Sequence, residues 1–142
     1  MTNRMKVEFD SISANEAFAR VTVAAFLAQL NPSVEEVADV KTAVSEAVTN
    51  AIIHGYQGEV HTITIEGELE GDLLTLRVRD EGVGIADIGQ AMEPLYTSRP
   101  ELERSGMGFL FMEAFMDEVL VESELGKGTC VTLRKRIGRG KD

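Results

Sequence analysis

Hydrophobic and polar residues alternate in several stretches of the chain, and a period of two predicts β-strands. The first stretch covers residues 5–9. Residues 62–69 and 74–78 alternate in the same way and are separated by a Gly-Asp turn, so we expect an antiparallel hairpin. Residues 119–121 and 129–133 predict two further strands near the C-terminus.

Three other stretches predict helices. Ser13 and Ser33 each stand three residues before a glutamate, which is the pattern of a capping box at the start of a helix. We therefore expect one helix over about 14–29 and a second that ends near Gly55, a typical stop residue. Residues 109–116 are apolar on all sides, which predicts a short buried helix.

The order of these elements predicts the fold class. A strand is followed by two helices, two strands, an irregular segment, a helix and two strands. The hairpin favours a mostly antiparallel sheet, and the amphipathic helices must cover one of its faces, which gives a two-layer α/β sandwich. The 142 residues match one ordinary domain, so we expect a single domain over 1–142.

Charge and composition narrow the function classes. The formal net charge of −10 disfavours non-specific binding of nucleic acid and of anionic membrane surfaces, but leaves a basic protein or a magnesium-bound nucleotide possible. The single cysteine, Cys130, allows neither an internal disulfide nor a thiolate metal site. No apolar run reaches the ~18 residues of a membrane span and no signal sequence is visible, so we expect a cytoplasmic protein.

Glu46 and Asn50 are the first candidates for chemistry. They are four residues apart on the second predicted helix and therefore share one face. Asparagine is a poor helix former, which makes its place late in a long helix notable. A solvated polar stripe would show the same spacing, so the pattern by itself leaves both interpretations open.

Asp80 is the second candidate. It continues the alternation of the apolar residues before it, which predicts a side chain on the inner face of the sheet. A carboxylate there needs hydrogen-bond donors, and the amine of a nucleobase is one. Gly82 and Gly84 permit a close backbone approach, and Thr129 has the same inward parity on the last strand. Ordinary turns would also explain both segments.

Two segments are typical of loops that hold ligands. Residues 85–105 lack a clear period and contain two prolines, and a long irregular segment inside a compact domain is usually functional. Gly106 and Gly108 stand directly before the last predicted helix, where backbone N–H groups favour anions. A plain glycine loop remains the alternative.

In this order the motifs resemble the GHKL, or Bergerat-fold, ATPase superfamily of gyrase, the large heat-shock chaperones, the mismatch-repair proteins and the histidine kinases. The resemblance runs from Glu46 to Leu133. Residues 46–56, 79–85 and 104–109 are most similar to the anti-sigma-factor serine kinases of sporulating bacteria. That family implies a homodimer that sequesters a sigma factor and transfers the γ-phosphate of ATP to a serine of an anti-anti-sigma protein.

The resemblance also implies a role for each matching residue. Asn50 corresponds to the magnesium-binding asparagine, Glu46 to the carboxylate that takes a proton from the attacking hydroxyl, and Asp80 to the residue that reads adenine. The remaining expected contacts to ATP or ADP are Gly82, Gly84, Arg104, Ser105, Gly106, Met107, Gly108 and Thr129, and residues 85–105 correspond to the ATP lid. An ATP-gated binding module without transfer and a simple ATPase are the alternatives.

The first predicted helix carries a candidate partner surface. Its apolar residues cover more of the helix circumference than the stripe of ~100° that packing against one sheet face needs. Glu16 and Arg20 are four residues apart and sit together on it, and arginine is enriched at interface hot spots. We expect them to contact the sigma factor, although a surface salt bridge of little energetic consequence would have the same spacing.

Overall fold

The computed structural model describes residues 2–92 and 108–138. Its elements follow the predicted order, with the short helix α3 added inside the segment expected to be irregular. They are β1 (Thr2–Asp10), α1 (Ala14–Leu27), the 3-10 turn η1 (Ala28–Leu30), α2 (Val34–Asn50), the π-helical turn η2 (Ala51–Gly55), β2 (Thr62–Glu70), β3 (Leu73–Asp80), α3 (Ile88–Ala91), α4 (Gly108–Phe115), β4 (Glu118–Glu124) and β5 (Gly128–Arg136).

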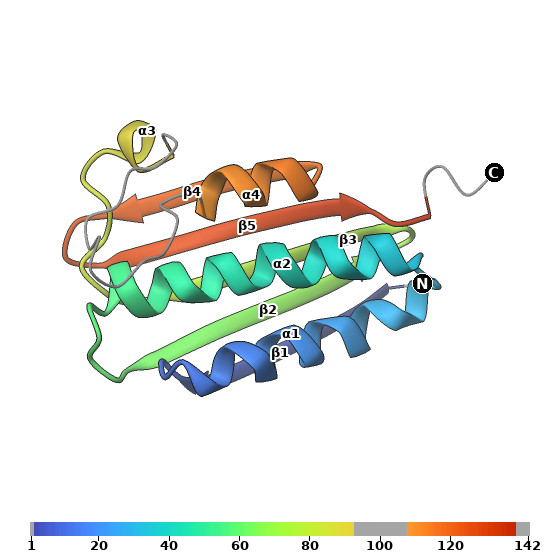
Figure 1. Ribbon diagram of the computed structural model, residues 1–142, viewed down its shortest axis with the longest axis horizontal. Coiled ribbons are helices and arrows are strands. Elements are labelled where there is room, and N and C mark those ends of the chain that lie inside the picture. The colour runs from blue at the N-terminus through green and yellow to red at the C-terminus, as the bar shows by residue number, and fades with distance from the viewer. Residues whose placement is uncertain (1, 93–107, 139–142) are drawn as a thin grey trace.

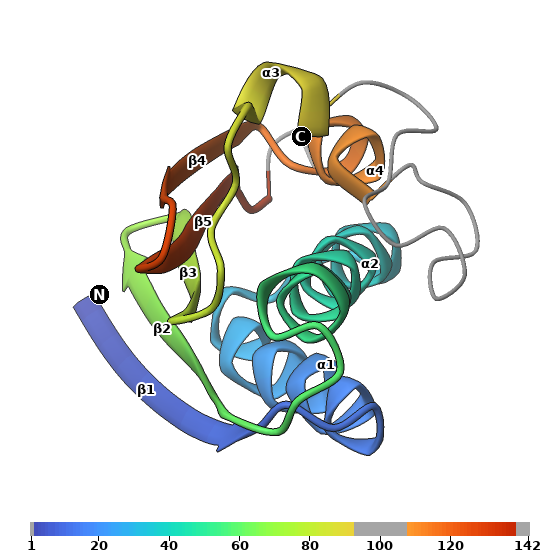
Figure 2. The same cartoon turned by 90° about the vertical axis from the view of Figure 1, so that its left-hand side faces the viewer.

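The strands form one five-stranded sheet in the order β1-β2-β3-β5-β4, in which every neighbouring pair is antiparallel. Helices α1, α2 and α4 lie side by side over one face of this sheet (Figures 1 and 2). The predicted two-layer sandwich is therefore confirmed.

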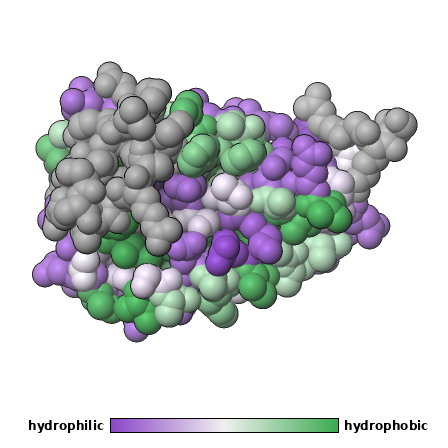
Figure 3. Space-filling model, viewed as in Figure 1, coloured by the Kyte–Doolittle hydropathy of each residue, from purple (hydrophilic) through white to green (hydrophobic). Residues whose placement is uncertain are grey.

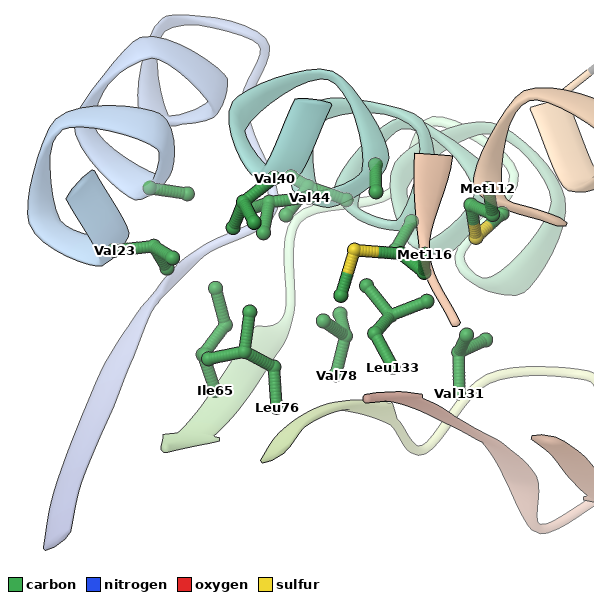
Figure 4. Packing of buried hydrophobic residues seen from close by; sticks show 14 of the residues in the cluster. Val23, Val40, Val44, Ile65, Leu76, Val78, Met112, Met116, Val131 and Leu133 are labelled. Carbon is green, nitrogen blue, oxygen red and sulfur yellow. The ribbon is translucent and has the colours of Figure 1, made fainter. Parts of the chain in front are cut away.

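The core fills the space between the two layers (Figure 4). Alternation places Ile65, Leu76 and Leu133 on the inner face of the sheet, where they are almost fully buried. Val44 of α2 and Met112 of α4 are fully buried on the helical side. The opposite sheet face carries charged pairs between neighbouring strands, such as Arg79–Glu66 and Arg134–Glu118.

The two predicted capping boxes have different outcomes. At Ser33 the box is confirmed, because its hydroxyl accepts the N–H of Glu36 while the Glu36 carboxylate accepts the N–H of Ser33. At Ser13 the prediction is wrong. Ser13 has helical backbone angles, φ −58° and ψ −30°, and its side chain caps nothing, since a capping serine needs an extended backbone to reach the helix N–H groups.

Three details of the elements differ from the prediction. The second helix ends at Gly55 as expected, but its last turn is a π-turn. The helix after the glycine loop is buried on one side only, since Leu110 is 36% exposed. Strand β4 continues to Glu124, three residues beyond the predicted end. Among the described helices, none has the length and apolar character to cross a membrane.

Candidate functional site

A cavity of about 300 Å³ lies between the end of α2, the ends of β3 and β5, and the segment that follows β3. Its lining combines an apolar interior with a few polar groups, which is typical of a small-molecule site. The lining includes Ala47, Asn50, Ala51, His54, Gly55, Val78, Asp80, Val83, Gly84, Ile85, Asp87, Gly108, Phe109, Leu125, Thr129 and Val131.

Asp80 lies at the end of β3 and lines this cavity, as the alternation predicted. Its carboxylate accepts the N–H of Gly82 at 2.9 Å. Burial raises the pKa of Asp80 above its ordinary value of 3.8, and hydrogen bonds from the backbone N–H groups of Gly82 and Thr129 oppose that rise. The carboxylate therefore keeps acceptor capacity for a further donor in a poorly hydrated place.

Glycine is required at two positions around Asp80. A Cβ on Gly82 would lie 2.0 Å from the carbonyl oxygen of Gly55, so the two backbones touch. Gly84 has a φ of +78°, and a Cβ there would lie 2.3 Å from the carbonyl oxygen of Glu124. Both glycines that the sequence singled out thus close the loop after β3 against its neighbours.

Glu46 and Asn50 meet the start of α4. A Cβ on Gly108 would lie 3.1 Å from Oε2 of Glu46 and 3.3 Å from Oδ1 of Asn50. The structure therefore brings three candidates together from two helices. The Nδ2 atom of Asn50 is buried and lacks a hydrogen-bond partner among the described residues. Such orphaned groups are rare in proteins and point to a missing ligand.

The described residues contain no group of three or more His, Cys, Asp or Glu side chains that could hold a metal ion. A magnesium site would consequently need ligands from elsewhere, and magnesium in nucleotide sites commonly uses one or two protein oxygens, water and the phosphates. The amide of Asn50 at the cavity wall, with Glu46 beside the same glycine, fits that pattern.

Thr129 pairs with Asp80 across the β3–β5 register. Its hydroxyl lies 2.8 Å from that of Ser123. Ser123 in turn accepts the N–H of Ile85 at 2.7 Å, which ties the segment after β3 to β4. The sequence reasoning missed Ser123 because it ended the strand at Val121, although the same alternation continued by two residues would have shown its inward parity.

Two further residues near the cavity were not among the predicted site residues. His54, in the turn that ends the second helix, lines the cavity. Tyr56 is buried, and its hydroxyl accepts the N–H of Glu81 at 2.8 Å, directly after Asp80. No sequence period marked Tyr56, because it lies outside every strand and helix.

Several predicted contacts lie outside the described residues. They are Arg104, Ser105, Gly106 and Met107, together with most of the expected lid. Of the lid, residues 85–92 are described and include the short helix α3, which begins at the capping residue Asp87. Gly108 is the described member of the expected phosphate loop.

Glu16 and Arg20 lie away from the cavity, on α1. Their side chains approach to 3.8 Å, as the spacing predicted. The Glu16 carboxylate also accepts the hydroxyl of Ser45 on α2. The Nε atom of Arg20 is the second buried side-chain atom of the described residues that lacks a hydrogen-bond partner. Both orphaned atoms thus belong to residues singled out from the sequence.

The fold and the cavity together define a class of protein, the nucleotide-binding domains of the Bergerat type. In agreement, residues 11–135 match the family Histidine kinase-like ATPase domain. The RsbU and RsbW domains of Rv1364c from Mycobacterium tuberculosis have a similar fold, with a TM-score of 0.68 and 23% identity, over 95% of this chain and 32% of that one.

Closer relatives are similar over their whole length. The anti-sigma F factor of Geobacillus thermodenitrificans is 58% identical over 99% of this chain and 97% of its own. The anti-sigma F factor of Clostridium beijerinckii is 61% identical over 95% of each chain. The chain therefore belongs to the histidine kinase-like ATPase domain family and, within it, to the group of anti-sigma F factors.

Proposed function

We propose that this protein is a cytoplasmic anti-sigma factor and a serine kinase. It binds and inhibits a sporulation sigma factor, and it transfers the γ-phosphate of ATP to a serine of an anti-anti-sigma protein. The observation that carries the kinase assignment is that Glu46 lies beside Asn50 and Gly108, two residues that line the same cavity as Asp80. The close relatives named anti-sigma F factor support the sigma-factor assignment.

The cavity supports one orientation of the nucleotide. At the inner end, the Asp80 carboxylate accepts a hydrogen bond from the adenine amine, and the apolar walls cover the base. At the other end, Asn50 faces the phosphates, and the N–H groups at the start of α4 donate to them. Magnesium bound with ATP supplies the neutralisation of phosphate charge that this chemistry requires.

Glu46 performs the proton transfer in this proposal. The oxygen of the substrate serine attacks the γ-phosphorus, its proton passes to the Glu46 carboxylate, and ADP leaves with the electron pair of the broken P–O bond. Positioning and a general base are the main contributions that a protein makes to such a reaction. The position of Glu46 beside Gly108 supports this role.

The test is transfer of label from γ-labelled ATP, with magnesium, to the purified anti-anti-sigma protein. Glu46→Gln should slow transfer by about a hundredfold or more, the usual size of a general-base contribution. It should bind ADP as the parent does, because Glu46 is not among the residues that line the cavity. Glu35→Gln, an exposed carboxylate on the same helix, is the matched control and should transfer normally.

Three other outcomes would change the proposal. Normal transfer by Glu46→Gln would remove Glu46 from the chemistry. Tight ATP binding by the parent protein with no transfer at all would indicate a binding module that uses ATP to set its shape. Release of phosphate at the same rate with and without the acceptor protein would indicate a simple ATPase.

We place the sigma-factor contact at Glu16 and Arg20. The guanidinium of Arg20 approaches the Glu16 carboxylate to 3.8 Å, and that carboxylate also accepts the hydroxyl of Ser45. The Arg20 side chain is 41% exposed, while its buried Nε atom has no hydrogen-bond partner among the described residues. A partly exposed arginine with unused donors suits an interface hot spot that binds an acidic group of a partner.

A second copy of the chain best explains the remaining exposed face of α1. Phe18 is 49% and Val21 is 65% exposed. Together with exposed alanines they form what we call the α1 seam, which consists of Ala14, Ala17, Phe18, Val21, Ala25 and Ala28. Figure 3 shows hydrophobic side chains along the lower edge of the molecule, where α1 lies. Two copies that each carry a net charge of −10 repel each other at their charged surfaces, whereas the seam is uncharged and allows contact.

The seam is also self-complementary. In an antiparallel pair of α1 helices centred on Val21, residues at equal distances from the centre face each other. Phe18 then lies opposite Ala24 of the second copy, so a large side chain meets a small one, and Ala17 lies opposite Ala25. A twofold axis requires such a match of a surface with itself, which supports a homodimer through this seam.

A further inference from the structure

Tyr56 joins three segments of the chain at the end of the helix that carries Asn50. The residue is 6% exposed and directly follows the π-turn. Its hydroxyl donates to the carbonyl of Thr62, at the start of β2, and accepts the N–H of Glu81 at 2.8 Å. A tyrosine hydroxyl has one donor, so its donor and its acceptor side are both engaged.

The neighbouring Gly55 makes a second connection to the same loop. Its carbonyl accepts the N–H of Val83 at 2.9 Å, and a Cβ on Gly55 would lie 2.7 Å from the Asp80 carboxylate. The π-turn makes this possible, since it ends the helix with the N–H of Tyr56 bonded to Ala51. Single π-turns occur frequently at functional sites.

We propose that Tyr56 is a positioning residue for the nucleotide. Its hydroxyl holds the backbone of the loop after β3 against the end of the Asn50 helix. It thereby fixes the distance between Asp80, which reads the base, and Asn50, which faces the phosphates. This inference rests on the proposed nucleotide site. It adds to that site a residue that is not part of the cavity lining itself.

The chemistry of the hydroxyl suits this task. Burial raises the pKa of Tyr56 above its ordinary value of 10.0, so the group stays protonated and donates at neutral pH. Removing the hydroxyl leaves the carbonyl of Thr62 and the N–H of Glu81 without their partner. An unpaired buried group is unfavourable, so the loop shifts toward water and carries Asp80 with it.

The experiment is a double-mutant cycle in which ADP with magnesium is titrated calorimetrically into the full chain. Tyr56→Phe should lower ADP affinity about tenfold, the size of one lost hydrogen bond to a buried group. If Tyr56 acts through Asp80, the double variant with Asp80→Asn should bind no more weakly than Asp80→Asn alone, because coupled residues are not additive.

Ser11→Ala is the matched control. Ser11 is also buried, and its hydroxyl bridges Glu59 and His61 in the adjoining loop without touching the loop after β3. Its removal should lower the melting temperature as Tyr56→Phe does, but leave ADP affinity unchanged. Equal ADP affinities of Tyr56→Phe and Ser11→Ala would overturn the inference, even where Asp80→Asn binds too weakly to titrate.

Two remaining outcomes separate this inference from the proposed function. A tenfold loss that simply adds to that of Asp80→Asn would show that Tyr56 does not act through Asp80. Unchanged ADP affinity in Asp80→Asn would instead contradict the nucleotide site itself, and the inference would fall with it.

Discussion

At the scale of single residues, the site depends on groups whose surroundings keep them ready for a ligand. Asp80 is held by backbone N–H groups in a place that disfavours its charge. Asn50 has a buried amide nitrogen that finds no hydrogen-bond partner among the residues the structure describes. Gly82 lies where any side chain would collide with the backbone of Gly55. Such arrangements lower the stability of the empty protein and are typical of functional sites.

The first prediction follows from the raised pKa of Asp80. A group whose folded pKa lies above its unfolded value stabilises the fold at low pH, and this contribution is lost as pH rises through the folded pKa. Without nucleotide, the free energy of unfolding of the parent protein should therefore fall relative to that of Asp80→Asn as pH rises above about 3.8, the ordinary value. Urea unfolding of both proteins from about pH 4 to 8 measures this difference.

The sign of this trend is the test. Asparagine does not titrate. A constant effect of the substitution, such as an altered hydrogen bond to Gly82, therefore changes the difference in unfolding free energy by the same amount at every pH. A difference that is flat over this pH range, or that grows with pH in favour of the parent protein, would contradict the burial of the carboxylate.

At the scale of elements, α1 carries two proposed contact surfaces on different sides. Glu16 and Arg20 point to the α2 side, where Ser45 holds Glu16. The α1 seam points to solvent and contains no charge. The sequence correctly indicated that this helix has more apolar surface than the sheet can cover. The predicted capping box at Ser13 was wrong, because the Glu16 carboxylate accepts a hydrogen bond from Ser45 rather than from the start of its own helix. A contact between helices has no local sequence pattern.

The second prediction separates the two sides of α1. Val21→Glu should raise the dimer dissociation constant at least about a hundredfold, because the seam's twofold axis would bring two carboxylates together away from water. The 65% exposure of Val21 in one chain means that the protomer should still fold. Sedimentation velocity over a range of concentrations measures the constant.

Arg20→Glu is the matched control on the same helix. It should leave the dimer intact and weaken binding of the cognate sigma factor by at least about 2 kcal/mol, the hot-spot threshold. An unchanged dimer in Val21→Glu would move the dimer contact to another surface. Wild-type sigma-factor affinity in Arg20→Glu would move the docking surface away from Glu16 and Arg20.

At the scale of the whole molecule, the alternation of apolar residues was sufficient for the layers, the hairpin and the antiparallel sheet, because each strand has one buried face. The same parity predicted that Asp80 and Thr129 point inward. It could not predict the π-turn or the bridges made by Tyr56 and Ser123, which depend on contacts between distant segments. The approach of Gly108 to Glu46 and Asn50 likewise arises only when α4 packs on α2.

The proposed function depends on nucleotide binding in the cavity between Asp80 and Asn50, with Asp80 on the base. Calorimetric titration with ADP and magnesium measures this binding. Asp80→Asn should remain folded and lose roughly ten- to hundredfold in affinity, because an amide replaces the charged acceptor of the base amine. Asp87→Asn, the same change at another residue of the cavity lining, should bind normally, since asparagine caps α3 as well as aspartate does. A folded Asp80→Asn protein with the affinity of the parent would show that Asp80 does not bind the base.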